Sequence, residues 1–159
     1  MIICRKLLKA ELFQLISKVS SEFRNSSSKI LGPPTVYPEY GQGIPGKDRI
    51  SSWETRYGSG EDQWIELEFE KAAAPSKIEI YETFTSGCLD KILAKNEDGS
   101  WACIWKRKSL IQIIEKSRIF SPELDLENLS TPSKTLRLEF KCSGHVLCID
   151  SVKMTGFIP

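Results

Sequence analysis

The stretch DQWIELEFEKAAAPSKIEIYETFTSG, residues 62–87, decides the fold of this chain. Apolar and charged side chains alternate along 64–70 and again along 77–80, which is the period of a strand with one buried and one solvated face. The Ala- and Pro-containing run 71–76 between them predicts a turn, so we expect a β-hairpin. A small polar loop, 83–88, follows. We interpret the hairpin as a scaffold and the loops at one end of the fold as the working surface.

Short strands separated by turn residues continue to the end of the chain. The further expected strands are 91–95, 101–106, 118–126, 135–141 and 146–154. Asp98-Gly99 is a strong hairpin signal between the first two of these, whereas 109–117 fits either a short helix or another strand. The apolar spacing of the last strand suggests a bulge near Asp150–Ser151. The connections are too short for crossover helices, so the sequence predicts an all-β fold with two antiparallel sheets packed as a sandwich.

The first part of the chain has a different pattern. Its apolar residues recur at three- and four-residue steps, which predicts an amphipathic helix over residues 5–23. These residues are Leu8, Leu12, Leu15, Ile16, Val19 and Phe23. A targeting presequence would also explain the basic residues near the start, but Glu11 and Glu22 argue against it because presequences avoid acidic residues. The run RNSSSKILGPP that follows is typical of a linker. We therefore expect an N-terminal helix and linker over 1–34 and a β-sandwich domain over 35–159.

The composition is that of an ordinary globular domain. The 159 residues are enough for one domain, and 40% of them are hydrophobic and 27% charged. Lys and Arg total 22 and Asp and Glu total 21, so no basic excess points to nucleic acid. No apolar run is long enough for a transmembrane helix, and the start lacks the pattern of a secretory signal. Five cysteines, an odd number without a CxxC pair, favour reduced thiols in an intracellular protein.

The strand pattern also sorts the loops. If the strands alternate in direction, successive connections fall at opposite ends of the sandwich. One end then collects the aromatic, Gly-rich and His-containing connections, which are 54–63, 83–88, 106–117, 142–145 and the lead-in 37–53. We expect a ligand or partner to bind there, because aromatic and Arg side chains on loops carry much of the binding energy of interfaces. The candidate residues are Trp53, Arg56, Tyr57, Phe84, Thr85, Ser86 and His145. Trp53 and Phe84 have an alternative role as plugs of the sandwich core, which we favour for Trp53.

The residues give no pattern of catalysis or metal binding. His145 is the sole histidine, which excludes a zinc site built from several histidines. The sequence has no G-x-S-x-G nucleophile motif and no glycine-rich phosphate-binding motif in a strand-to-helix setting. We expect Cys103 and Cys148 to fill strand cores as small apolar residues. The expectation is a protein that is not an enzyme and holds no cofactor.

Several motifs resemble those of a known superfamily. They are GPPTVYPEYG (32–41), QWIELEFE (63–70), ETF (82–84), WACIW (101–105) and the closing LRLEF and IDSVKMTG. In this order they resemble discoidin-type, galactose-binding-like domains, and within that superfamily the N-terminal domain of F-box/leucine-rich-repeat proteins. The resemblance covers most of the chain, from about Leu15 to Gly156. It implies a jelly-roll β-sandwich whose loop end contacts ligands. It also implies substrate selection for a ubiquitin ligase linked to mitochondria, so we expect a cytoplasmic or mitochondrial location.

The chain departs from these relatives in two ways. It contains no F-box and no leucine-rich repeats, so by itself it would not dock a ligase. Secreted discoidin relatives bracket the domain with a cysteine pair that is missing here, which weakens inherited sugar- or lipid-binding roles. Some relatives hold a structural cation, and Asp48 marks where Ca²⁺ would lie, although we expect none. The leading hypothesis is a protein-recognition module, and the alternative is a carbohydrate-binding module of the same fold. The oligomeric state is left open.

Overall fold

The computed structural model describes residues 8–22, 26–41, 52–56, 62–141 and 144–159. Within these ranges the chain forms strands joined by loops, with one short 3-10 helix. The strands are β1 (Leu8–Val19), β2 (Trp53–Glu54), β3 (Asp62–Phe84), β4 (Leu89–Lys95), β5 (Trp101–Lys106), β6 (Arg118–Phe120), β7 (Ser133–Lys141) and β8 (Cys148–Ile158), and the helix is η1 (Ser26–Ile30). Every pairing between these strands is antiparallel, so the predicted all-β, antiparallel architecture is confirmed.

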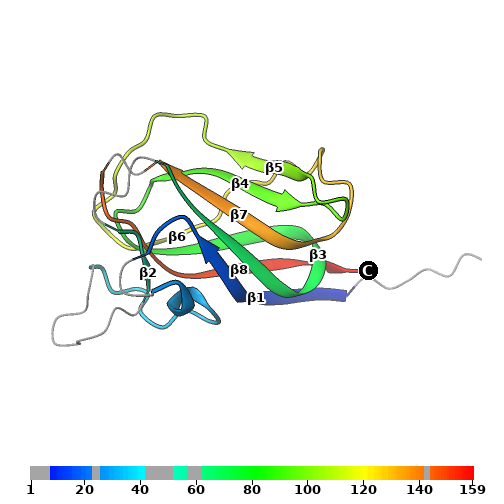
Figure 1. Ribbon diagram of the computed structural model, residues 1–159, viewed down its shortest axis with the longest axis horizontal. Helices are drawn as coiled ribbons and strands as arrows, with labels where there is room; N and C mark the ends of the chain where they lie inside the picture. The colour runs from blue at the N-terminus through cyan, green and yellow to red at the C-terminus, as the bar shows by residue number, and fades with distance from the viewer. Residues whose placement is uncertain (1–7, 23–25, 42–51, 57–61, 142–143) are drawn as a thin grey trace, which may run out of the picture.

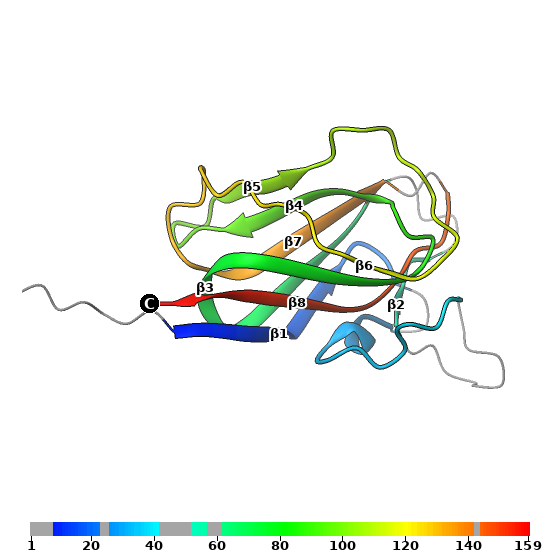
Figure 2. The ribbon, with the colours of Figure 1, turned by 180° about the vertical axis from the view of Figure 1, so that it is seen from behind.

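The strands form two sheets that pack face to face (Figures 1 and 2). The front sheet, which faces the viewer in Figure 1, has the order β1–β3–β7–β4–β5. The back sheet has β8 at its centre, with β1 and β2 along one side of it and β3 and then β6 on the other. β1 and β3 each belong to both sheets, one half to each. The apolar residues of the two inner faces form one continuous core between the sheets.

The hairpin predicted over 62–87 is wrong. Residues 62–84 form the single strand β3, whose first half pairs with β7 and whose second half pairs with β8. The Ala- and Pro-rich segment reverses the chain as predicted, but it carries the chain from the front sheet into the back sheet, so the two halves do not pair with each other, and register shifts mark the bend. Small residues permit the bend because it lies against Gly156, where an added Cβ would come within 2.5 Å of the Ala74 carbonyl oxygen.

The helix predicted over residues 5–23 is also wrong. Residues 8–19 form β1, which pairs with β8 through its first half and with β3 through its second half. A register shift between Gln14 and Ile16 marks a bulge where the strand passes from the back sheet to the front sheet. The extra residue breaks the two-residue alternation, so the apolar positions of the two halves fall at three- and four-residue steps and imitate a helical stripe. Residues 8–19 therefore lie within the sandwich.

The β4–β5 hairpin and the bulge in β8 agree with the predictions. A backbone hydrogen bond of 2.8 Å between Asn96 and Ser100 closes the hairpin at the expected turn. In β8, Ser151 and Ile149 lie opposite consecutive residues of β3, which leaves Asp150 as the extra residue. The bulge turns the side chain of this residue away from the regular ladder, and this orientation matters for the site described below.

The region between β5 and β7 is less regular than expected. Only Arg118–Phe120 of the expected strand 118–126 is a strand. Segment 109–117 is neither a helix nor a strand, and its one ladder contact is an isolated bridge between Ser86 and Ile114. In the part of the chain that the structure describes, no helix has the length and apolar character to cross a membrane.

Candidate functional site

Connecting segments meet at one end of the sandwich, on the left of Figure 1 and away from the C-terminus. We define the loop end as residues 35–41, 52–56, 83–88, 107–117 and 144–147. Backbone hydrogen bonds join neighbouring segments: Gly41 N–H donates to the Thr83 carbonyl at 3.1 Å, and Ile114 N–H donates to the Ser86 carbonyl at 2.8 Å. The grouping of loops predicted from alternating strand directions is confirmed for these residues.

Asp150, the bulged residue of β8, fixes the first of these segments. Its Oδ2 accepts backbone hydrogen bonds from Thr35, Val36 and Tyr37 at 2.9, 2.9 and 2.8 Å. The side chain is 1% exposed, so water does not compete for these bonds. Charge-assisted hydrogen bonds in such a shielded place are strong. The segment that leads to Tyr40 is therefore held firmly against β8.

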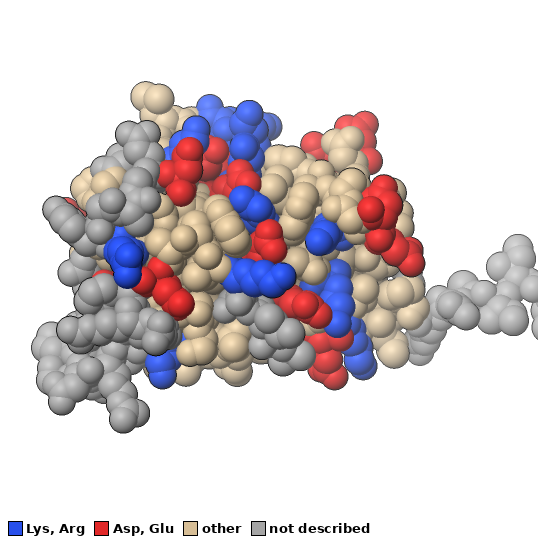
Figure 3. Space-filling view, viewed as in Figure 1, with Lys and Arg blue, Asp and Glu red and all other residues tan. Residues whose placement is uncertain are grey.

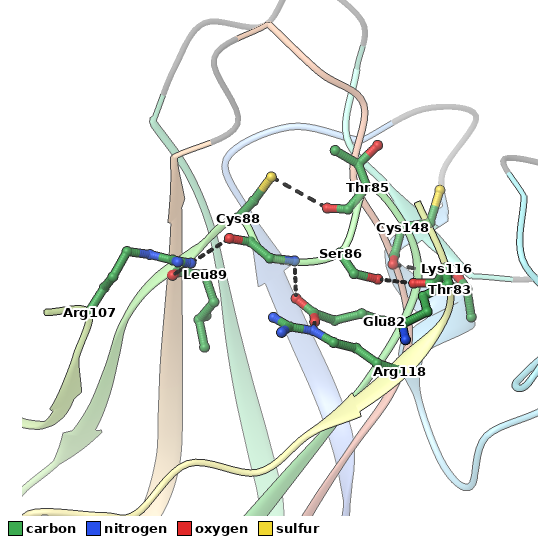
Figure 4. A network of polar contacts seen from close by, with 11 residues as sticks. Glu82, Thr83, Thr85, Ser86, Cys88, Leu89, Arg107, Lys116, Arg118 and Cys148 are labelled. Carbon is green, nitrogen blue, oxygen red and sulfur yellow. Dashed lines mark hydrogen bonds and ion pairs between the residues drawn. The ribbon is translucent and has the colours of Figure 1, made fainter. Parts of the chain in front are cut away.

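Glu82 and the half-buried Arg118 form an ion pair beneath loop 83–88 (Figure 4). They lie directly opposite each other on β3 and β6. Glu82 is fully buried; its Oε2 accepts a hydrogen bond from Arg118 Nε, and its Oε1 accepts one from the Gly87 N–H at 3.3 Å. Burial raises the pKa of Glu82, and the Arg118 guanidinium opposes that shift. The pair anchors the loop, because removal of Arg118 leaves the buried charge of Glu82 without its partner.

Loop 83–88 is also fitted closely to segment 107–117. Thr85 and Gly87 both have positive φ, +51° and +100°. Ser86 is fully buried, and its Oγ donates to the Lys116 carbonyl at 2.8 Å. Gly87 has no room for a side chain, since an added Cβ would collide with the carbonyl oxygen of Gln112. The two segments therefore pack as one unit.

Arg107 fastens the other side of the same loop (Figure 4). Its Nη2 donates to the Gly87 carbonyl at 2.5 Å and also to the Leu89 carbonyl. Its Nε is buried and, within the described part of the chain, has no hydrogen-bond partner. Arg107 thus ties the start of segment 107–117 to loop 83–88 and to the start of β4, while its buried Nε–H has no acceptor among the described residues.

Two aromatic rings face outward at the loop end, and we call Tyr40 and Phe84 the aromatic pair. Their ring centroids are 5.3 Å apart and their planes make an angle of 39°. Tyr40 is 40% exposed, and Phe84 is half-buried. In the back sheet, Cys148 pairs with Phe84 on one side and with Glu54 on the other. The end of β3, the start of β8 and the end of β2 therefore lie side by side in a row. The pair lies at the end of this row.

Trp53 is a core residue. It is fully buried, its ring lies 5.8 Å from that of Phe140, and its Nε1 donates to the Ser21 carbonyl at 3.1 Å. The plug role favoured for it from the sequence is what the structure shows. It therefore offers no surface to a ligand.

The other predicted site residues lie in different environments. Thr85 and Ser86 are buried, so they shape the loop and do not face solvent. Arg56 and His145 are exposed on the segments that follow β2 and precede β8. Tyr57 lies outside the described residues. Of the predicted set, Arg56 and His145 are thus exposed and Phe84 is partly so.

A groove opens beside the loop end, on the flank where β5, an edge strand of the front sheet, approaches β6, an edge strand of the back sheet. Its volume is about 1050 Å³. It is lined by parts of β5, β6 and the segments 103–114 and 123–125. Trp105 and Phe120 meet edge to face, 5.3 Å between centroids, and close the gap between the two strands. We call this the side groove.

Metal binding and thiol chemistry can be assessed for the described residues of this end. No group of three or more His, Cys, Asp or Glu residues within the described ranges could hold a metal ion. Cys148 is buried as predicted, and burial raises the pKa of its thiol. The prediction for Cys103 is wrong: it is exposed, because Ala102 and Ile104 take the inward positions of β5. Asp48 lies outside the described residues.

Sequence reasoning missed Tyr40, Glu82, Arg107 and Arg118. Glu82 could have been found, because it falls in the same two-residue phase as the core residue Ile80. A carboxylate in that phase requires a buried cationic partner. Nothing in the sequence indicates which of many basic residues supplies it, since Arg118 comes from a strand far along the chain.

Known proteins resemble this chain in structure and not in sequence. No protein-family model matches the sequence, and no curated protein matches it. The lectin-binding domain of Lectinolysin, complexed with Lewis b, matches with a TM-score of 0.61 and 13% identity, over 89% of this chain and 91% of that one. The family 32 carbohydrate-binding module of C. perfringens NanJ, in complex with galactose, matches with 0.56 and 15%, over 92% and 99%. Reduced XRCC1 bound to the DNA polymerase beta catalytic domain matches with 0.63 and 10%, over 91% and 97%.

Identities this low establish the fold alone. The chain has the galactose-binding-like, discoidin-type β-sandwich fold of these domains, as the resemblance in its motifs predicted.

Proposed function

We propose that this chain is a non-enzymatic carbohydrate-binding module that holds its ligand at the loop end. The aromatic pair is the main observation behind the proposal: Tyr40 is 40% exposed and lies against Phe84. The segments that carry the two rings are held by Asp150 and by the ion pair of Glu82 and Arg118. The faces of sugar rings present C–H groups that pack on aromatic rings, while their hydroxyls need polar groups around the rim. Arg56 and His145 are exposed on neighbouring segments and supply such groups.

The solved neighbours support carbohydrate binding more than the protein-recognition role that led our expectations from sequence. Lectinolysin's domain is complexed with Lewis b, and the NanJ module is in complex with galactose. A further neighbour is a chitosan-binding module, with a TM-score of 0.54 and 11% identity. These ligands belong to those proteins, and the fold they share with this chain makes a glycan the first ligand to test here.

A glycan array tests the proposal. The wild-type chain should bind defined glycans, and Tyr40→Ala should weaken that binding roughly tenfold or more, because one stacked aromatic ring contributes about 1.5 kcal/mol or more. Trp101→Ala is the matched control. Trp101 is the first residue of β5, at the end of this strand away from segment 107–117. The Lys95 ammonium lies 5.4 Å from its ring centroid. A wild-type chain that binds no glycan, or equal losses in both variants, would contradict the proposal.

Protein recognition is the second candidate, because the XRCC1 structure of the same fold is bound to the catalytic domain of another protein. Under this alternative, Arg56→Ala combined with Phe84→Ala should abolish capture of a protein partner and leave the unfolding midpoint nearly unchanged. Loss of folding in the double variant would make these residues structural. A pull-down that returns no protein, beside an array with glycan signals, favours the carbohydrate proposal.

Closeness to F-box/leucine-rich-repeat protein 4, with a role in ubiquitin-ligase substrate selection, stays a prediction from the sequence motifs. The intracellular location, cytoplasmic or mitochondrial, and the absence of catalysis and of a cofactor are likewise proposals. Proximity labelling in cells tests location and partners together. We expect intracellular neighbours, and enrichment of ligase subunits would support the F-box connection. Labelling of secretory-pathway proteins would contradict the location.

A further inference from the structure

The side groove carries positive charge at the loop end and negative charge farther away. Lys106, Arg107 and Lys108 follow one another at the end of β5 and line the groove. Lys and Arg side chains gather at the top of Figure 3, over the end of β5. Glu123 and Asp125 line the groove beside the middle of β5. The Asp125 N–H donates a hydrogen bond to the Ile104 carbonyl at 2.8 Å. This bond holds Asp125 beside the middle of β5.

The two lysines are available to a ligand. Both are exposed, and within the described ranges neither forms an ion pair. Arg107 between them has its guanidinium tied to backbone carbonyls, and its buried Nε has no partner among the described residues. Three successive cations at the mouth of a groove, two of them lysines without an ion-pair partner within the described ranges, attract anionic groups.

The floor and the far part of the groove suit a different kind of group. Trp105 and Phe120 are half-buried there and offer apolar ring surface. Glu123 and Asp125 are exposed and form no ion pair with another described residue. Asp125 Oδ1 accepts a hydrogen bond from the Glu127 N–H at 3.1 Å, and its Oδ2 and the Glu123 carboxylate can accept hydrogen bonds from a ligand. The groove volume of about 1050 Å³ lies slightly above the usual range for small-molecule sites, roughly 300–1000 Å³.

We infer that the side groove binds an anionic oligosaccharide of the uronic-acid class, an inference that rests on the carbohydrate-binding function proposed above. A carboxylate of the ligand lies against Lys106 and Lys108. A ring face packs on Trp105, and hydroxyls farther along donate to Glu123 and Asp125. The side groove shares segment 107–114 with the loop end, so a chain of sugars can extend from one to the other.

An acidic peptide fits the groove less well. Its carboxylates recur along its length, so those that reach Glu123 and Asp125 would be repelled. Sugar hydroxyls, in contrast, donate hydrogen bonds to carboxylates. The separation of the two charge types along the groove therefore selects a ligand that is both anionic and rich in hydroxyls.

The test is isothermal titration of the whole chain with trisaccharides of galacturonate, mannuronate and guluronate, each beside its methyl ester. The ester keeps the shape and removes the charge. We expect at least one acid form to bind roughly tenfold more tightly than its ester, the sum of two solvent-exposed charge contacts. Added salt should reduce the difference.

The variant Lys106→Gln with Lys108→Gln should lose this preference and keep its affinity for the esters. Lys77→Gln with Lys134→Gln is the matched control: it removes the same charge from the outer sheet faces, where both lysines are about half exposed, at 52% and 49%. We expect the control to keep the preference. If both double variants lose the preference for the acid form equally, the preference depends on net charge alone, and the inference is overturned.

The remaining outcomes separate this inference from the proposed function. If neutral glycans bind at the aromatic pair but no uronate binds more tightly than its ester, the inference fails and the proposed function stands. If no glycan of either kind binds, both fail. If a tetraglutamate peptide binds more tightly than every uronate, the groove takes acidic peptides and the inference is overturned.

Discussion

The outer faces of the two sheets and the loop end use charged residues in opposite ways. On the faces, charged side chains pair with one another, as in the back sheet where Glu79 contacts Lys77 on its own strand and Lys153 on β8, both at 2.8 Å. Figure 3 shows the two signs intermixed over the front face. At the loop end, Glu82 pairs with Arg118 while fully buried, and the lysines at the mouth of the side groove have no ion-pair partner within the described ranges.

This difference locates the working surface. Paired charges keep a flat sheet face solvated and leave few unpaired groups for a ligand to bind. At the loop end the buried pair fixes the loops in position, so exposed groups there meet a ligand with little loss of conformational entropy. Removing charges should therefore affect stability most beneath the loop end and least on the faces.

The largest effect is expected from Arg118→Ala. This change leaves the fully buried carboxylate of Glu82 without its cation. It should lower the free energy of unfolding by about 3–5 kcal/mol, measured by urea denaturation. Adding Glu82→Gln to it should restore part of the loss, because the remaining side chain is then neutral. A loss below about 1 kcal/mol for Arg118→Ala would show that the pair does not anchor the loop.

Gly87→Ala should have the next largest effect, and Gly99→Ala is its control. Both glycines have positive φ, +100° and +87°. Only Gly87 lies against another segment, the carbonyl of Gln112, whereas an added Cβ at Gly99 meets nothing within 4 Å. Gly99→Ala should cost about 1 kcal/mol for its backbone conformation. Gly87→Ala should cost about 1–3 kcal/mol more and should also reduce glycan binding, because it displaces segment 107–117.

The pH dependence of Glu79→Gln should be small. Burial alone would raise the pKa of Glu79, but hydrogen bonds and charges from Lys153 and Lys77 outweigh it, and the pKa is lowered from the ordinary 4.5. Its ion pairs therefore stabilise the fold above that pH, and the stabilisation is lost as the pH falls through the folded-state pKa. The variant should be less stable than the wild type at neutral pH by less than about 1 kcal/mol, with the gap closing in acid.

Urea titrations over a pH series measure this gap. Glu82 has the opposite sign, because its raised pKa means that the penalty for burying its charge is relieved as the pH falls. A gap for Glu79→Gln that widens in acid would contradict the assignment.

The smallest effect is expected from Lys134→Gln. Lys134 and Glu68 form an exposed pair at 2.9 Å on the front face. Pairs of this kind are weakened by solvent and salt, so the unfolding midpoint should not change measurably. A clear loss of stability would mean that the faces contribute more than the comparison above implies.

Local pattern was sufficient to predict much of the fold. Ile65, Leu67 and Phe69 face the core as their alternation indicates, and Asp98-Gly99 closes the expected hairpin. Loop grouping followed because antiparallel strands reverse direction at each connection. These features depend on neighbouring residues alone, which is the information that a single sequence contains.

The errors occurred where a strand changes partners. The Ala and Pro residues near the middle of β3 have the composition of a turn, and only Gly156 on β8 makes a bend fit there. The bulge at Gln14 in β1 has the spacing of a helix, and only pairing with two sheets distinguishes it. The side groove was equally hidden, because it joins β5 to β6 through Trp105 and Phe120, whose contact no local pattern indicates.

Two strands that each serve both layers have a mechanical consequence. β1 and β3 run without interruption from one sheet into the other, so the layers cannot slide or separate without breaking hydrogen bonds in both strands. Slow amide exchange should therefore appear together in the two layers, with similar opening free energies in the central strands β7 and β8. The two sheets should open as one cooperative unit, and local fluctuations should be confined to the loops that connect the strands.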